Sequence, residues 1–189
     1  MSAFEYVIVM VSVVLSLGVA HSLAGFATLL QGSHRVRWSL THGIWWAVIF
    51  SCNLDLWLSL WTVRGQQIWP LGAWLSAFGA ACLVYLANYL ASPRPAAGDA
   101  VIDLWAFHQA NRKRYLTAQL GYLLVGMALN ATLLPQEFKL ANLTTAGPAL
   151  LGILLAIFIP NRWVQRLIAV VMLGLIAAYY VNFFSELRS

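Results

Sequence analysis

The chain has 189 residues, of which 61% are hydrophobic and 9% are charged, and its net charge at pH 7 is +5. A soluble domain carries about 25% charged residues, so this composition excludes a protein with a water-exposed surface. Each membrane-spanning helix needs about 20 apolar residues, so six such helices would use most of the chain. We therefore expect an all-α, polytopic membrane protein that forms one domain over residues 1–189.

Six apolar runs, separated by short polar or proline-containing segments, predict six transmembrane helices. They cover residues 4–30, 38–63, 70–91, 115–134, 144–159 and 163–184. In lipid every backbone amide must find its partner inside the same segment, so isolated apolar runs of this length form helices. The first run is too long for the core of a signal peptide, so we expect it to be retained.

The first span carries a polar face. Glu5, Ser12 and Ser16 fall on one side of a helix, and His21 lies late in the same span. Serines and alanines at every fourth position are also typical of close helix packing in membranes. These small-residue rows predict packing within one bundle or between copies of the chain, and we expect a homo-oligomer.

The second span contains Asp55, the strongest candidate for a functional residue. Asp55 lies about 10 Å from the end of this span, at 1.5 Å per residue. Ser51, Ser59 and Thr62 share its helix face. If this face meets the polar face of the first span, the two form an acidic recess that admits cations or protons. The alternative is that Asp55 is hydrogen-bonded and ties helices together.

His21 and His42 lie at the opposite end of the first two spans and are expected at similar depth. Two imidazoles on facing helices can hold a b-type haem or, with a third ligand, a transition metal. The alternative is that the histidines bind hydroxyl groups or lipid headgroups. No metal site is predicted, because the chain contains no HExxH or CxxCH sequence.

Residues 99–114 predict an interfacial amphipathic helix between the third and fourth spans. Acidic residues begin this segment and Arg112, Lys113 and Arg114 end it, an order that complements the helix dipole. The basic run is expected to bind anionic lipid. One long bent helix that continues into the fourth span is the alternative, since no helix breaker separates the two.

The distribution of basic residues predicts the orientation of the chain in the membrane. Six crossings place eight basic residues on the side opposite the amino terminus and three on the side of the termini. The positive-inside rule then makes the former side cytoplasmic and leaves both termini outside. The eight are Arg35, Arg37, Arg94, Arg112, Lys113, Arg114, Arg162 and Arg166.

Two stretches, EYVIVMVSVVLSLGVAHSLAGFATLLQGSHRVRW and DLWAFHQANRKRYL, resemble a group of small, uncharacterised bacterial inner-membrane proteins of similar length. That group has a glycine-containing first span, a basic loop, a tryptophan-rich second span and a later aromatic and basic stretch. The resemblance implies six spans and a bacterial inner membrane. It implies no activity and no site residue.

These observations favour a small channel or transporter for cations or protons. The basic residues lie in short loops between spans, so we expect no nucleic-acid partner. The chain contains no phosphate-binding loop, Rossmann glycine pattern or GxSxG motif, which argues against an enzyme. Two alternatives stay open: a redox protein that binds haem or quinone through His21 and His42, and a membrane scaffold or assembly subunit.

Overall fold

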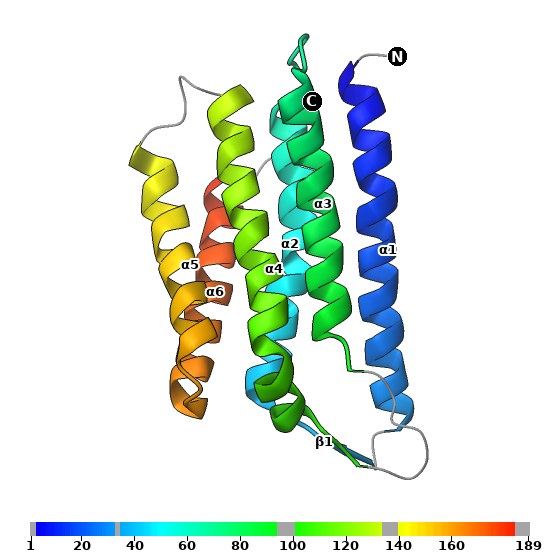
Figure 1. Ribbon diagram of the computed structural model, residues 1–189, viewed down its shortest axis with the longest axis vertical. Coiled ribbons are helices and arrows are strands. Elements are labelled where there is room, and N and C mark those ends of the chain that lie inside the picture. Colours follow the sequence, from blue (N-terminus) through cyan, green and yellow to red (C-terminus); the bar gives the residue numbers. More distant parts are fainter. Residues whose placement is uncertain (1–2, 33–34, 94–100, 134–139, 184–189) are drawn as a thin grey trace.

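The computed structural model is a bundle of six long helices (Figure 1). It describes residues 3–32, 35–93, 101–133 and 140–183, without the side chains of residues 140–145 and 182–183. The helices are α1 (Ala3–Gln31), α2 (Leu40–Thr62), α3 (Leu71–Ala91), α4 (Leu104–Leu133), α5 (Leu140–Phe158) and α6 (Arg162–Phe183). Two short strands, β1 (Val36–Arg37) and β2 (Ile102–Asp103), complete the described elements.

The helices confirm the all-α class and fall on the predicted apolar runs. Five of them, α1, α2, α3, α4 and α6, are long and apolar enough to cross a membrane. In α5 the apolar stretch with described side chains covers Ala146–Phe158 and is shorter than a full span. The described residues thus contain five helices that are long and apolar enough to span a membrane, and α5, a helix of 19 residues whose side chains are described only from Ala146 on.

The predicted interfacial helix over 99–114 is absent from the described residues 101–114, where the alternative of one long helix is found instead. The carboxylate of Asp103 accepts the backbone N–H groups of Trp105 and Ala106, each at 2.9 Å, so the helix begins directly after it. From Leu104 the helix continues without interruption to Leu133. At about 45 Å, α4 is longer than the roughly 30 Å of hydrocarbon in a bilayer.

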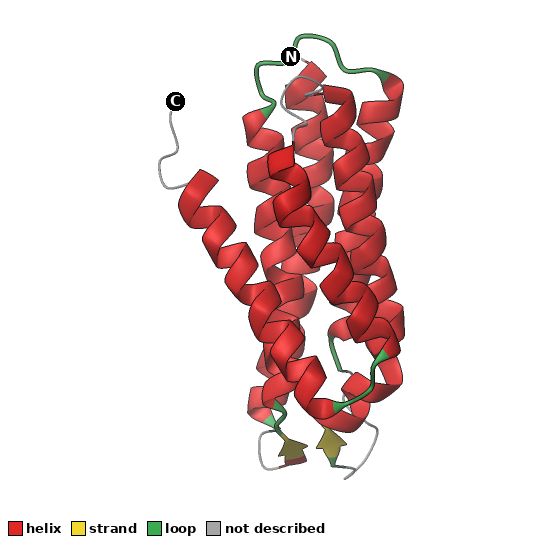
Figure 2. Ribbon diagram, turned by 90° about the vertical axis from the view of Figure 1, so that its left-hand side faces the viewer, coloured by secondary structure: helices red, strands yellow, loops and turns green. Residues whose placement is uncertain are grey.

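The helices pack in a fixed order across the bundle. Figure 1 shows α1 at one edge and α5 with α6 at the other. α1 packs mainly on α3, α3 on α4, and α2 on α6. The face of α1 that enters these contacts includes Val7, Val11, Leu15, Gly18 and Ser22. Figure 2 shows α6 leaning away from the other helices toward its C-terminal end.

A chain of buried polar side chains joins the first three helices. The hydroxyl of Ser22 donates to the Asn88 side-chain oxygen at 2.7 Å, and the Asn88 amide donates to the Asn53 side-chain oxygen at 3.4 Å. Gly18 lies beside this contact, and a Cβ atom there would be 3.0 Å from the Asn53 oxygen. A small residue at position 18 thus lets α1 approach these amides closely.

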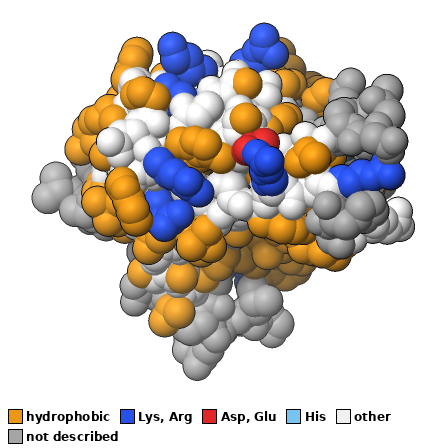
Figure 3. Space-filling model, turned by 90° about the horizontal axis from the view of Figure 1, so that it is seen from below, with side chains coloured by type: hydrophobic (Ala, Val, Ile, Leu, Met, Phe, Trp, Pro, Cys, Tyr) orange, Lys and Arg blue, Asp and Glu red, His pale blue; other side chains and the backbone are white. Residues whose placement is uncertain are grey.

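The two ends of the bundle differ in charge. We call the end at which α2, α4 and α6 begin the basic end, because Arg35, Arg37, Lys113, Arg114 and Arg162 lie there. Figure 3 shows basic side chains spread over this end, with apolar side chains around them. Here β1 and β2 pair in parallel, Val36 with Ile102 and Arg37 with Asp103. The opposite end is the amino-terminal end.

Replacing Gly18 by leucine should destabilise the bundle by about 1–3 kcal/mol, since the side chain must push α1 away from Asn53 and Tyr85. The measurement is the free energy of unfolding in detergent micelles. Gly79→Leu is the matched control, because nothing lies within 4 Å of a Cβ atom at that position. Equal stability of the two variants would contradict the proposed close approach.

Candidate functional site

A cavity lined by four helices lies around Asp55, and we call it the Asp55 cavity. Its volume is about 180 Å³. The polar residues that line it are Asp55 and Ser59 of α2, Gln119, Tyr122 and Asn130 of α4, and Tyr179 of α6. Leucines, methionines and alanines from α2, α4, α5 and α6 form most of the remaining wall. The cavity therefore combines an acidic group with apolar surroundings.

Hydrogen bonds hold the carboxyl group and its neighbours in place. The hydroxyl of Tyr122 donates to Oδ2 of Asp55, which links α4 to α2. Ser59 is a hydrogen-bond partner of Tyr179. Just below, the Tyr180 hydroxyl donates to the backbone carbonyl of Ser51 at 2.8 Å. Both tyrosines belong to α6, so this helix covers the polar side of α2.

Gln119 also lines the cavity, and its side-chain amide is only partly hydrogen-bonded. Its side chain is 2% exposed, and its amide nitrogen lies 3.7 Å from the sulfur of Cys52. Its side-chain oxygen is buried and has no hydrogen-bond partner among the described residues. A buried acceptor without a donor costs about 1–3 kcal/mol of folding free energy. A ligand that donates a hydrogen bond to this oxygen would recover that cost.

The polar residues predicted on the second span divide between two roles. Asp55 and Ser59 line the cavity, as their shared helix face suggested. The hydroxyls of Ser51 and Thr62 donate instead to carbonyls of their own helix, those of Ala47 and Ser59. Only the middle of the predicted polar face thus contributes side chains to the Asp55 cavity.

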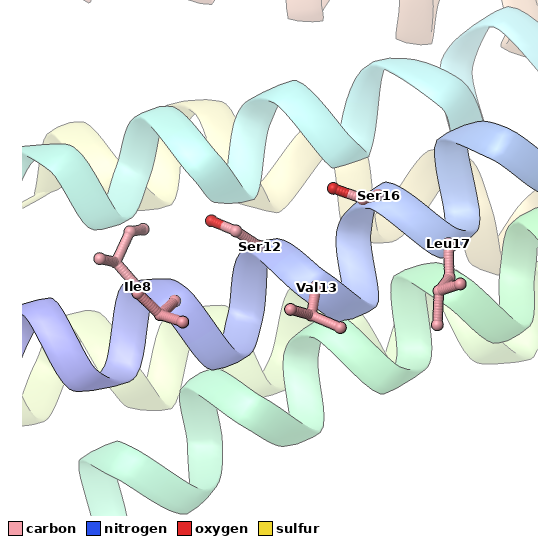
Figure 4. Close-up of a pocket in the computed structure, with 6 residues that line it drawn as sticks. Ile8, Ser12, Val13, Ser16 and Leu17 are labelled. Atoms are coloured by element: carbon pink, nitrogen blue, oxygen red, sulfur yellow. The ribbon is translucent and has the colours of Figure 1, made fainter.

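The structure does not bring the polar face of the first span to Asp55. Ser12 and Ser16 line a separate surface groove made by α1 alone, and Val13 and Leu17 point to its other side (Figure 4). Glu5 is exposed in the first turn of α1. The reason is that α1 packs mainly on α3, whereas α2, α4, α5 and α6 surround Asp55. The expected recess between the first two spans is therefore not found.

A second polar cluster lies near the basic end, around His42 and His108. Their rings are 6.1 Å apart between centroids, and both residues are fully buried. The His108 ring nitrogens contact the Tyr115 hydroxyl at 2.6 Å and the Gln165 side-chain oxygen at 3.2 Å. Among the described residues, no side chain is a hydrogen-bond partner of the His42 ring nitrogens, and the backbone of Ala91 is the polar group beside them. α2, α4 and α6 thus meet here through polar side chains.

This cluster changes the expected pairing of histidines. His21 stacks on Tyr89 of α3, with ring centroids 4.8 Å apart, whereas His42 lies against Phe107 and His108. A haem held by His21 and His42 thus finds no support in this arrangement. Both nitrogens of His108 are already engaged, so it is not a free ligand either. Among the described residues no group of three or more His, Cys, Asp or Glu side chains is placed to hold a metal ion.

One series of buried polar residues runs along α4 and connects the two clusters. We call it the polar face of α4, and it consists of His108, Arg112, Tyr115, Gln119 and Tyr122. Steps of four and three residues place them on one side of a helix. This spacing is visible in the sequence, although the predictions above name only Arg112 of the series.

Arg112 does not belong to the lipid-facing surface that the sequence predicted. Its side chain is 7% exposed and donates to the side-chain oxygen of Gln109. Lys113 and Arg114, in contrast, are exposed. Arg112 lies on the polar face of α4, so helix geometry turns the next two residues outward.

Replacing Gln165 by leucine should destabilise the protein by about 1–3 kcal/mol. The Gln165 amide donates to the carbonyls of Ala156 and Ile159, each at 2.6 Å, and its oxygen contacts His108. Leucine fills similar space but leaves these groups unpaired. Thermal unfolding in micelles measures the loss, and Gln67→Leu at an exposed position is the control. A Gln165 variant as stable as the control would show that these bonds add nothing.

No protein-family model matches this chain, and comparison with curated proteins and with solved structures gives no match either. The resemblance to small bacterial membrane proteins therefore stays a prediction. The Asp55 cavity and the polar face of α4 are the basis on which a function is assigned.

Proposed function

We propose that this protein is a small membrane transporter that moves protons or another small cation past Asp55. The observation that carries the proposal is a carboxyl group inside the bundle, hydrogen-bonded by Tyr122 and lining a cavity. An ionisable residue at the centre of a span costs about 2.5–3.5 kcal/mol on insertion, and such residues mark ion pathways and proton relays. None of the described residues that line the cavity is Lys, Arg or His, so the carboxylate has no fixed countercharge there.

The polar face of α4 supports a route from the cavity to the basic end. Tyr122, Gln119 and Tyr115 follow one another at about one helical turn, or roughly 5.4 Å. Beyond them, the Tyr115 hydroxyl contacts the His108 ring directly at 2.6 Å. Bridging water molecules can connect groups at this separation. The tyrosine hydroxyls and the His108 ring can both donate and accept protons, which a relay requires.

The proposal includes the arrangement of the chain in the membrane. α5 also crosses the membrane, which brings the number of spans to six. The membrane is a bacterial inner membrane, the basic end faces the cytoplasm, and both termini lie outside. The basic residues in the short connections at the basic end support this orientation by the positive-inside rule. Lys113 and Arg114, exposed on the first turns of α4, bind anionic lipid headgroups. The exposed small residues of α1, such as Ser16, provide a surface for self-association.

Asp55→Asn should reduce proton flux to the rate of protein-free vesicles, because an amide cannot take up or release the proton. The measurement uses vesicles with the purified protein, a trapped pH-sensitive dye and an imposed pH gradient. Asp103→Asn is the control, since asparagine caps a helix as well as aspartate does. Thermal unfolding of each variant reports whether it is folded.

Tyr122→Phe serves as a second test of the same site. Loss of its hydroxyl removes the hydrogen bond to Asp55 but keeps the acid and the ring, so flux should fall without vanishing. Unchanged flux in the Asp55 variant would reject the site. Equal loss in the Asp103 and Asp55 variants would show that the effect is not specific to the cavity.

A further inference from the structure

The size of the Asp55 cavity limits what it can hold. Ligand pockets for drug-sized molecules have volumes of about 300–1,000 Å³. The Asp55 cavity, at about 180 Å³, is smaller. It therefore suits a solute of a few heavy atoms, or several water molecules, rather than a large lipophilic ion.

Among the polar residues that line the cavity, Asp55 and Gln119 carry the acceptor oxygens that a ligand could use. Asp55 contributes carboxylate oxygens, of which one accepts from Tyr122. Gln119 contributes a buried side-chain oxygen without a partner. The two residues come from neighbouring helices and line the same space. A ligand that carries several N–H donors and a positive charge would complement both groups.

The rest of the wall is apolar and discriminates among cations. Leu56, Leu123, Met127, Met172 and Ile176 are among the apolar residues that line it. A bare metal cation such as Ca²⁺ requires six to eight oxygen ligands, and it gains nothing from side chains of this kind. An alkyl chain, in contrast, is stabilised by contact with them.

We propose that the Asp55 cavity binds a small primary alkylammonium ion, whose N–H groups donate to Asp55 and Gln119 and whose alkyl chain packs on the apolar wall. This inference rests on the proposed function and names the substrate class of the same site. The ammonium group supplies the countercharge that the lining residues lack. Its three N–H groups can donate to more than one acceptor oxygen at once, and a short alkyl chain is compatible with the small volume of the cavity.

The test is calorimetric titration of the full-length protein in micelles with n-butylammonium chloride. Two probes isolate the recognised features: tetramethylammonium has the charge without N–H donors, and butan-1-ol has the chain without the charge. Butylammonium should bind at least about tenfold more tightly than either. Binding of tetramethylammonium or butanol with equal affinity, or no binding of butylammonium, would overturn the inference.

Two variants assign the contacts. Asp55→Asn and Gln119→Leu should each weaken butylammonium binding by about tenfold, because each removes one acceptor. Gln67→Leu, which lies outside the cavity, should bind as the unaltered protein does. Undiminished binding by both cavity variants would place any bound amine elsewhere. Competition in the unaltered protein, where butylammonium should slow proton flux, gives the same information if a variant fails to fold.

The flux assay separates this inference from the proposed function. If Asp55→Asn abolishes proton flux but butylammonium neither binds nor competes, the substrate class is wrong and the transport function stands. If butylammonium binds through Asp55 but no flux of protons or of labelled methylammonium is found, the site exists and the transport function is wrong.

Discussion

The structure depends on a few hydrogen bonds that buried polar side chains of one helix make with side chains of another. Lipid chains offer no hydrogen bonds, and apolar packing alone does not select one neighbouring helix over another. Here the contact of Ser22 with Asn88 joins α1 to α3, and that of Asp55 with Tyr122 joins α2 to α4. Gln165 joins α6 to α4 through His108. A small number of polar pairs therefore determines which helix faces meet.

These pairs serve two different purposes. Asn88 is fully buried and donates to both Asn53 and the Val84 carbonyl, so its amide is occupied by holding helices together. Asp55 and Gln119 instead line an open volume, and the Gln119 oxygen has no protein donor. A saturated contact stabilises, whereas an unsaturated one beside a cavity is available for a ligand. This difference is the physical basis for choosing the Asp55 cavity as the site.

The sequence predicts the helices better than it predicts their contacts. Hydropathy is a local property, so the apolar runs locate the spans, and a lone aspartate within one of them stands out. Contacts between spans are not local: Tyr122 is 67 residues from Asp55 along the chain. The sequence predicts His21 and His42 at similar depth on facing helices, but α4 lies against α2 and places His108 beside His42 instead. The 3–4 spacing on α4 was the available signal for that face.

The parallel pairing of β1 with β2 has a mechanical consequence. β1 ends just before α2, and β2 ends just before α4. The strand pairing therefore connects the starts of the two helices that carry Asp55 and Tyr122. A slide of α2 along α4 would break the hydrogen bonds between β1 and β2, whereas a tilt of the helices about this pairing would not. A tilt of α2 against α4 that keeps this pairing would part the carboxyl group from the tyrosine, and its amplitude would be largest at the amino-terminal end.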